Sequence, residues 1–223
     1  MQTTAHDAGP ARPGREQTPA EELANSLTHG LGLLLSIACL VLLVIFATLK
    51  GTAWHIVSCS VFGAMLVLLY LSSTLYHGVR HRGAKAVLNI IDHSAIYLLV
   101  AGTYTPYTLG PLRGHGGWVL FGIVWGIALL GIAFQALFIH RYRILSVASY
   151  LAMGWAVVFA IKPILRHLPR PAILWLAAGG LCYTVGIVFY AWKRPFFHAV
   201  WHLFVLAGSL CHFFSILLYI AVP

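Results

Sequence analysis

Long apolar blocks, separated by short polar or basic connections, fill most of the chain. An apolar run of about 18 residues or more predicts a membrane-spanning helix, because about 20 residues at about 1.5 Å each cross a hydrocarbon core of about 30 Å. Seven blocks are long enough, and they lie at about 27–49, 53–76, 87–109, 118–139, 144–161, 171–192 and 197–220. The pattern therefore predicts an all-α integral membrane protein built as a bundle of seven transmembrane helices.

The amino-terminal stretch breaks this pattern. Residues 1–22 are polar, rich in Pro, Gly and Thr, and lack the apolar core of a signal peptide. Such a composition is typical of a disordered segment. We therefore expect two parts, a short disordered tail over 1–22 and a single transmembrane domain over 23–223.

Composition agrees with a membrane protein and argues against a nucleic-acid binder. Charged residues make up 9% of the chain, against about a quarter in a soluble domain. The net charge of +9 comes from Lys and Arg between the blocks, where membrane topology and anionic lipid headgroups account for it. The expected partners are therefore membrane lipids. No Cys-x-x-Cys pair occurs, and we expect all four cysteines to act as small apolar residues: Cys39, Cys59, Cys182 and Cys211.

The distribution of Lys and Arg also predicts an orientation. With seven spans, the tail and three connections share one side and carry nine of these residues, whereas the other side carries five. Positive residues concentrate on the cytoplasmic side of membrane proteins. We therefore expect the amino terminus in the cytoplasm and the carboxyl terminus outside.

The last apolar block opens with two histidines, His198 and His202. Residues four apart lie on one face of a helix, so both imidazoles can bind one metal ion. A zinc site needs at least three protein ligands. Taken alone, the pair fits equally well with buried imidazoles that are hydrogen-bonded to carbonyl groups.

The predicted topology brings a third histidine to the same depth. His77 ends the second block and Asp92 lies near the start of the third, on the side where the last block begins. Three imidazoles with one open position are typical of a catalytic zinc ion. We therefore expect His77, His198 and His202 to bind zinc.

Asp92 needs a partner, because an aspartate at bilayer depth costs about 2.5–3.5 kcal/mol. It is the only acidic residue within the seven blocks. The partner is either the metal and its water or a cation of the nearby connection: Arg80, Arg82 or Lys85. We favour the metal, with Asp92 holding or deprotonating the water.

Other polar residues near the same level have weaker assignments. Ser73 lies one turn before His77 and would bond the water or a substrate oxygen, unless its hydroxyl bonds back to its own helix. Glu22, Asn25 and His29 share one helix face and would cover or polarise the site, or only cap the helix. We expect a hydrogen-bonding role for His29, with a fourth metal ligand as the alternative. Two further histidines have no predicted role in the metal site: His93 and His212.

Three motifs, each with polar residues one helical turn apart, resemble those of the progestin and adipoQ receptor family: Glu22-x2-Asn25-x3-His29, Ser73-x3-His77 followed by Asp92, and His198-x3-His202. The sequence around them looks like that of the bacterial hemolysin III branch. The resemblance implies seven transmembrane helices in a bacterial-type plasma membrane. It also implies zinc held by the three histidines, with Asp92 and Ser73 beside the zinc-bound water. Ala199 stands where the eukaryotic receptors have proline, which argues against a hormone-receptor role.

We therefore expect a zinc-dependent intramembrane hydrolase of lipid amides or esters. A site inside a bilayer is reached most easily by lipids, and the resemblance adds ceramide-like substrates and membrane lipid homeostasis. One alternative is a non-catalytic sensor or regulator of the membrane state, in which zinc is structural. The other is a hemolysin-type pore, against which the lack of polar residues along the helices argues. The sequence predicts neither a protein partner nor an oligomeric state.

Overall fold

The computed structural model describes residues 17–138 and 143–222, and its regular structure there is entirely helical. Seven helices of this described part are long and apolar enough to cross a membrane. They confirm the predicted seven-helix membrane bundle. The elements are α1 (Pro19–Lys50), α2 (Ala53–Gly78), α3 (Arg82–Leu109), the turn η1 (Arg113–Gly117), α4 (Trp118–Phe138), α5 (Arg143–Gly154), the 3₁₀ segment η2 (Trp155–Ala160), α6 (Ile161–His167), α7 (Arg170–Ala191) and α8 (Phe197–Tyr219).

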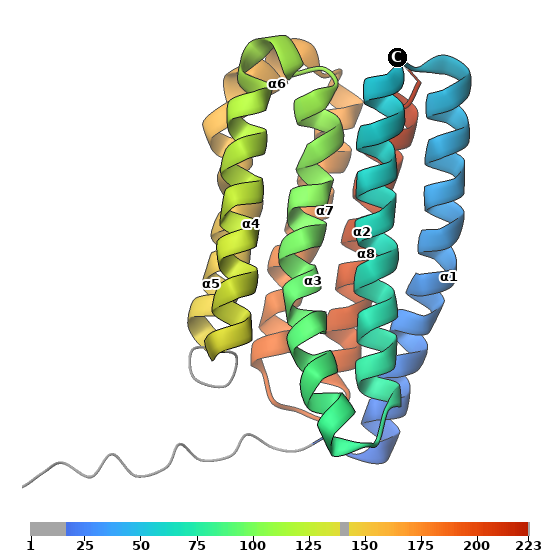
Figure 1. The fold of residues 1–223 in the computed structure, drawn as a ribbon, viewed down its shortest axis with the longest axis vertical. Helices are drawn as coiled ribbons and strands as arrows, with labels where there is room; N and C mark the ends of the chain where they lie inside the picture. The colour runs from blue at the N-terminus through green and yellow to red at the C-terminus, as the bar shows by residue number, and fades with distance from the viewer. Residues whose placement is uncertain (1–16, 139–142, 223) are drawn as a thin grey trace, which may run out of the picture.

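The helices run side by side along the long axis of the molecule (Figure 1). Each of α1 to α4 packs against the next helix, and α8 packs against both α7 and α1. The first and last helices are therefore neighbours. The starts of α1 and α8 lie at the same end of the bundle as the α2–α3 connection, at the bottom of Figure 1.

Helix α1 begins earlier than the sequence predicts. Thr18 caps it: the Thr18 Oγ1 accepts a hydrogen bond from the Glu21 amide at 3.3 Å, and the Glu21 carboxylate accepts one from the Thr18 amide at 3.0 Å. This reciprocal pair is a capping box. Residues 19–22 are thus helical and not part of a tail, while 1–16 lie outside the described residues. The expectation that Asp92 is the only acid within a span is also wrong, because Glu21 and Glu22 belong to α1.

Two other boundaries differ for local reasons. Helix α3 starts at Arg82, because the His81 side chain accepts from the Ala84 amide at 3.3 Å and caps it. Lys85, predicted in a connection, is therefore helical. The fifth span continues to His167 through Pro163. Pro163 lies in the first turn of α6, where proline is tolerated.

Small residues allow the helices to approach closely, as is common in membrane bundles. A Cβ atom at Gly131 of α4 would lie 2.4 Å from the Tyr97 ring of α3. The same tyrosine forms a hydrogen bond of 2.6 Å with Ser149 of α5. Gly131 therefore determines how close α4 lies to α3.

Replacing Gly131 with valine should destabilise the bundle by about 1–3 kcal/mol, because the added side chain overpacks a filled contact. Gly126 is the matched control, since nothing lies within 4 Å of a Cβ atom placed there on the same helix. Thermal denaturation in detergent measures the difference. Equal melting temperatures for Gly131→Val and Gly126→Val would contradict the proposed packing.

Candidate metal centre

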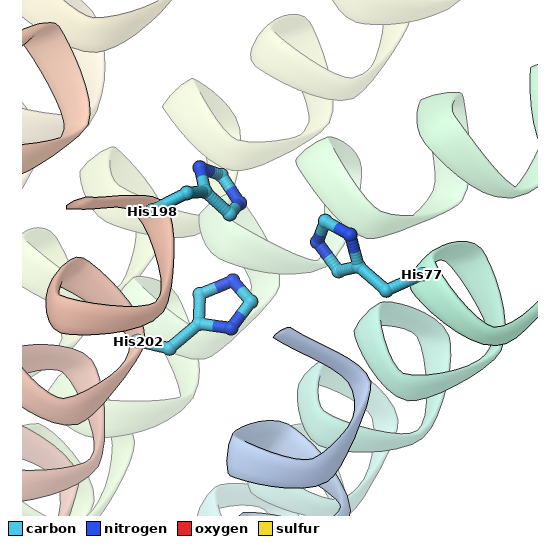
Figure 2. Close-up of side chains that lie close together, drawn as sticks. All are labelled: His77, His198 and His202. Atoms are coloured by element: carbon cyan, nitrogen blue, oxygen red, sulfur yellow. The ribbon is translucent and has the colours of Figure 1, made fainter. Parts of the chain in front are cut away.

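Three histidines from two helices converge at the end of the bundle where α1 and α8 begin. His77 lies in the last turn of α2, and His198 and His202 lie in the first turns of α8. One nitrogen from each ring can be chosen so that all three lie within 4.8 Å of one another. Their side chains point toward one another (Figure 2). The structure thus brings the predicted ligands together, and their role as metal ligands stays a prediction.

The hydrogen bonds of His77 leave one ring nitrogen free for a metal ion. Its Nδ1 lies 2.6 Å from the Glu22 carboxylate, which can only accept, so Nδ1 carries the proton and donates. The Nε2 atom is buried and has no hydrogen-bond partner. A carboxylate behind the distal nitrogen of a metal-binding histidine is a recurrent arrangement.

His202 also carries its proton on Nδ1, which leaves Nε2 free. Its Nδ1 lies 3.1 Å from the Thr28 Oγ1 and 3.3 Å from the Asn25 carbonyl oxygen. The Thr28 hydroxyl donates to the backbone of its own helix, so both oxygens accept from His202. The buried Nε2 again has no partner. Two orphaned nitrogens in one cluster fit a divalent metal ion that prefers imidazole, such as zinc.

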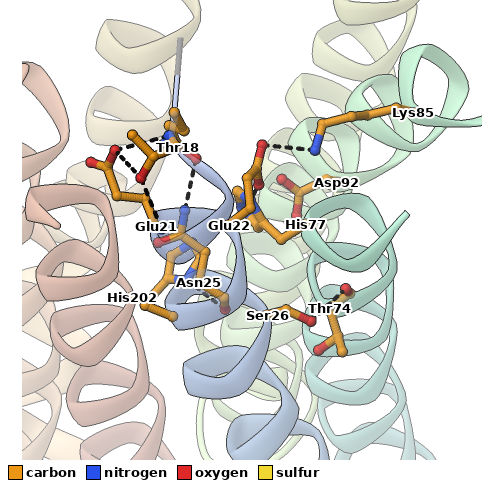
Figure 3. Close-up of polar contacts among 12 residues, drawn as sticks. Thr18, Glu21, Glu22, Asn25, Ser26, Thr74, His77, Lys85, Asp92 and His202 are labelled. Carbon is orange, nitrogen blue, oxygen red and sulfur yellow. Dashed lines mark hydrogen bonds and ion pairs between the residues drawn. The ribbon is translucent and has the colours of Figure 1, made fainter. Parts of the chain in front are cut away.

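Helix α1 supplies side chains that lie beside His77 and His202 (Figure 3). The Glu22 carboxylate also accepts a hydrogen bond of 2.7 Å from Lys85 of α3. His29 stacks on His202, with ring centroids 3.5 Å apart. Both nitrogens of His29 are buried without partners, so the hydrogen-bonding role expected for this residue is wrong for the described residues. Asn25 contributes its backbone carbonyl, whereas its side-chain amide donates to Gln17 at 2.7 Å.

Glu21 holds the start of α8 in place. Its carboxylate accepts a hydrogen bond of 3.0 Å from the Phe196 amide, one residue before α8. Phe196 has a φ of 61°, which is unusual for a residue other than glycine. The contact therefore stabilises the strained turn that leads into His198. Sequence reasoning gave roles to neither Glu21 nor Thr28, although the capping-box spacing of Thr18 and Glu21 was readable.

Asp92 and Ser73 lie next to each other beside this cluster. Both side chains are buried. The Ser73 hydroxyl lies near the Asp92 carboxyl group, but the geometry between them does not meet the criteria for a hydrogen bond. The Ser73 hydroxyl therefore does not donate to a carbonyl of its own helix, which was the alternative interpretation. Such a bond occurs at Ser72, which donates to the Leu69 carbonyl at 2.9 Å. The alternative pairing of Asp92 with Lys85 is not seen, because Lys85 binds Glu22.

His93 and His212 make their contacts outside the three-histidine cluster. The His93 Nδ1 lies 2.9 Å from the Asn89 carbonyl of its own helix and 3.8 Å from Asp92. His212 is buried deeper along α8, with its ring 5.4 Å from that of Tyr183. Neither joins the metal-ligand group found among the described residues.

A cavity of about 280 Å³ lies inside the bundle, and His29, which stacks on His202, lines one end of it. It lies between α3, the fifth span, α7 and α8, and its lining is almost entirely apolar. Asp92, His29 and Trp201 line the end near the histidines, and Leu112 and Ile164 line the far end. An apolar chain in this cavity would reach the carboxyl group of Asp92.

Comparisons with known proteins identify relatives across nearly the whole chain. A family model described as haemolysin-III related matches residues 17–213. Hemolysin-3 homolog of Bacillus subtilis (strain 168) is 53% identical over 91% of this chain and 95% of its own, and hemolysin-3 of Bacillus cereus is 47% identical over 90% and 92%. The human monocyte to macrophage differentiation factor is 28% identical over 95% and 89%. No solved structure gives a significant match.

Replacing Glu22 with glutamine should lower zinc affinity about 10–100-fold, because the charged acceptor behind His77 is lost. Chelator competition on the purified protein measures this affinity. Glu21→Gln is the matched control, since its amide oxygen can still accept from the Phe196 amide. Equal zinc affinity in Glu22→Gln and the unchanged protein would rule out this role for the carboxylate.

Proposed function

This chain belongs to the haemolysin-III-related family of multi-pass membrane proteins, and we propose that it is a zinc-dependent intramembrane hydrolase of lipid amides or esters. The observation that carries the proposal is one of position. Asp92 and His29 line one end of an apolar cavity inside the bundle, and His29 stacks on His202 of the three-histidine cluster, which has two orphaned nitrogens. Water-activating groups and room for a lipid chain therefore meet at one place.

Zinc would be held by His77, His198 and His202. A zinc ion in this position supplies a Lewis acid that polarises a carbonyl group and makes water a better nucleophile. The protein keeps the ligand nitrogens unprotonated: Glu22 accepts from His77, and Thr28 with Asn25 accepts from His202. Their Nε2 lone pairs are thereby directed to the centre of the cluster.

Asp92 and Ser73 would carry out the proton chemistry. A carboxylate oxygen of Asp92 takes the proton from the attacking water as general base and later returns it to the leaving amine or alcohol. The Ser73 hydroxyl, which has no other partner, donates to the water or to the oxyanion that develops on the substrate carbonyl. The apolar lining binds the acyl chain and keeps bulk water away.

The predicted orientation would place this site near the cytoplasmic face of a bacterial-type plasma membrane, within reach of lipids from the inner leaflet. Ceramide-like amides are the substrates suggested by the sequence resemblance, and membrane lipid homeostasis is the corresponding cellular role. A pore has the least support, because the cavity lining is apolar and would not conduct ions.

A second candidate is a non-catalytic regulator with structural zinc. The observation that favours it is the connection of separate helices at one site. His77 comes from α2 and the other two histidines from α8, and α1 binds both through Glu22 and Thr28. Zinc would then hold these helices together and report on the state of the membrane.

Asp92→Asn separates the two functions. Under the hydrolase proposal the variant keeps its zinc but loses turnover of short-chain ceramide and ester analogues about 10²–10⁴-fold, because the general base is gone. Zinc content and hydrolysis are measured on the same sample in mixed micelles.

Unchanged turnover in Asp92→Asn would show that Asp92 is not the base. If the unchanged protein cleaves no lipid amide or ester while zinc removal lowers its melting temperature, the regulator is the correct function.

A further inference from the structure

A second pocket, more polar than the first and called the polar pocket below, opens beside the histidine cluster. It has a volume of about 430 Å³ and is lined from α3 by Arg82, Lys85, Asn89 and His93. Tyr76 of α2 and Tyr190 of α7 also line it. The ring centroid of Tyr76 lies 4.7 Å from that of His77, and the ring centroid of Tyr190 lies 5.9 Å from that of His198. The polar pocket is thus adjacent to the proposed metal site.

The polar pocket and the apolar cavity adjoin. Val147, Tyr150 and Tyr190 line both. The Tyr150 hydroxyl accepts from the Gln135 amide at 2.6 Å and donates to the His93 carbonyl at 3.2 Å, so its ring is fixed at the junction. The two pockets therefore meet at Tyr150, and Asp92 lines the apolar one.

The charge of the polar pocket is positive. Arg82 is exposed and has no ion-pair partner among the described residues. Lys85 lies 4.9 Å from the Tyr76 ring centroid, and Lys193 lies 5.0 Å from that of Tyr190, so a lysine stands over each of these tyrosines. No Asp or Glu of the described chain lines the pocket. Glu22 neutralises part of the charge on Lys85, which leaves Arg82 as the main unpaired cation.

The apolar cavity has room for one chain. On α3 its lining extends from Asp92 to Tyr107, which is 15 residues or about 22 Å along a helix. A volume of about 280 Å³ spread over that length makes an elongated cavity, which fits one extended alkyl chain.

From this juxtaposition we propose that the polar pocket binds the phosphate-type anionic headgroup of a single-chain amphiphile whose tail occupies the apolar cavity. Guanidinium and ammonium groups form charge-assisted hydrogen bonds with such oxygens. That this amphiphile is a substrate rests on the proposed function. Bound in this way, its bond to be cleaved would lie beside Asp92, between headgroup and tail. Binding itself needs no hydrolysis.

The test measures binding to the full-length protein in nanodiscs of zwitterionic lipid, with empty nanodiscs as the blank. The probes are hexadecyl phosphate and hexadecanol, which share a chain and offer no carboxylic amide or ester to cleave, and inorganic phosphate alone. We expect hexadecyl phosphate to bind most tightly. Arg82→Gln should weaken its binding about tenfold, the effect of one charge-assisted bond, and leave hexadecanol unchanged.

Arg80→Gln is the matched control, because Arg80 is exposed on the same connection but does not line the pocket. A second variant, Asn89→Asp, adds a negative charge inside the pocket and should also weaken hexadecyl phosphate selectively. If Arg82→Gln and Arg80→Gln lose the same affinity for hexadecyl phosphate, the probe binds through general charge at the membrane surface, and the proposal is overturned. Equal affinity for hexadecyl phosphate and hexadecanol, or inorganic phosphate binding as tightly as hexadecyl phosphate, would overturn it too.

These outcomes are independent of the proposed function. If hexadecyl phosphate shows no selective binding while ceramide or ester analogues are still cleaved, only the headgroup site is lost. If selective binding is found but no analogue is cleaved, the headgroup site stands and the hydrolase proposal fails.

Discussion

Glu22 is a carboxylate placed among apolar helices, and the geometry of the histidine cluster depends on how its charge is satisfied. An acid in this environment requires a partner, and Glu22 has two, His77 at 2.6 Å and Lys85 at 2.7 Å. These contacts connect α1 to α2 and to α3. Because the carboxylate can only accept, it holds the His77 proton on Nδ1 and leaves Nε2 to face the other histidines. One side chain thus determines both the position and the protonation of a predicted ligand.

Residues near the start of α1 also hold the start of α8 and orient His202. Glu21 caps its own helix and holds the Phe196 amide, while Thr28 and the Asn25 carbonyl orient His202. The cluster therefore forms only when α1 and α8 lie side by side. The apolar cavity lies between α3, the fifth span, α7 and α8, and the polar pocket adjoins it. Site, cavity and pocket are consequences of one helix arrangement.

Much of this arrangement could be predicted from the sequence. The lengths of the apolar blocks determine the number of spans, and the alternation of direction then puts His77 at the level of His198 and His202. The four-residue spacing puts that pair on one helix face. The start of α1 was missed because a polar composition was interpreted as a tail, although Thr18 and Glu21 have capping-box spacing. The partners of Glu22 could not be predicted, because helical periodicity does not define how α1 is rotated against α2 and α3. The cavities were also out of reach, because they depend on how far α7 lies from α3.

The zinc content of the purified protein and its X-ray absorption spectrum test whether the three histidines hold one zinc ion. We expect about one zinc ion per chain, bound by imidazole nitrogens and by no sulfur, as in a three-histidine site. The ion should be lost in His202→Ala. Less than about half an equivalent of zinc, unchanged in His77→Ala and His202→Ala, would contradict zinc binding by the three histidines, as would sulfur in the ligand shell.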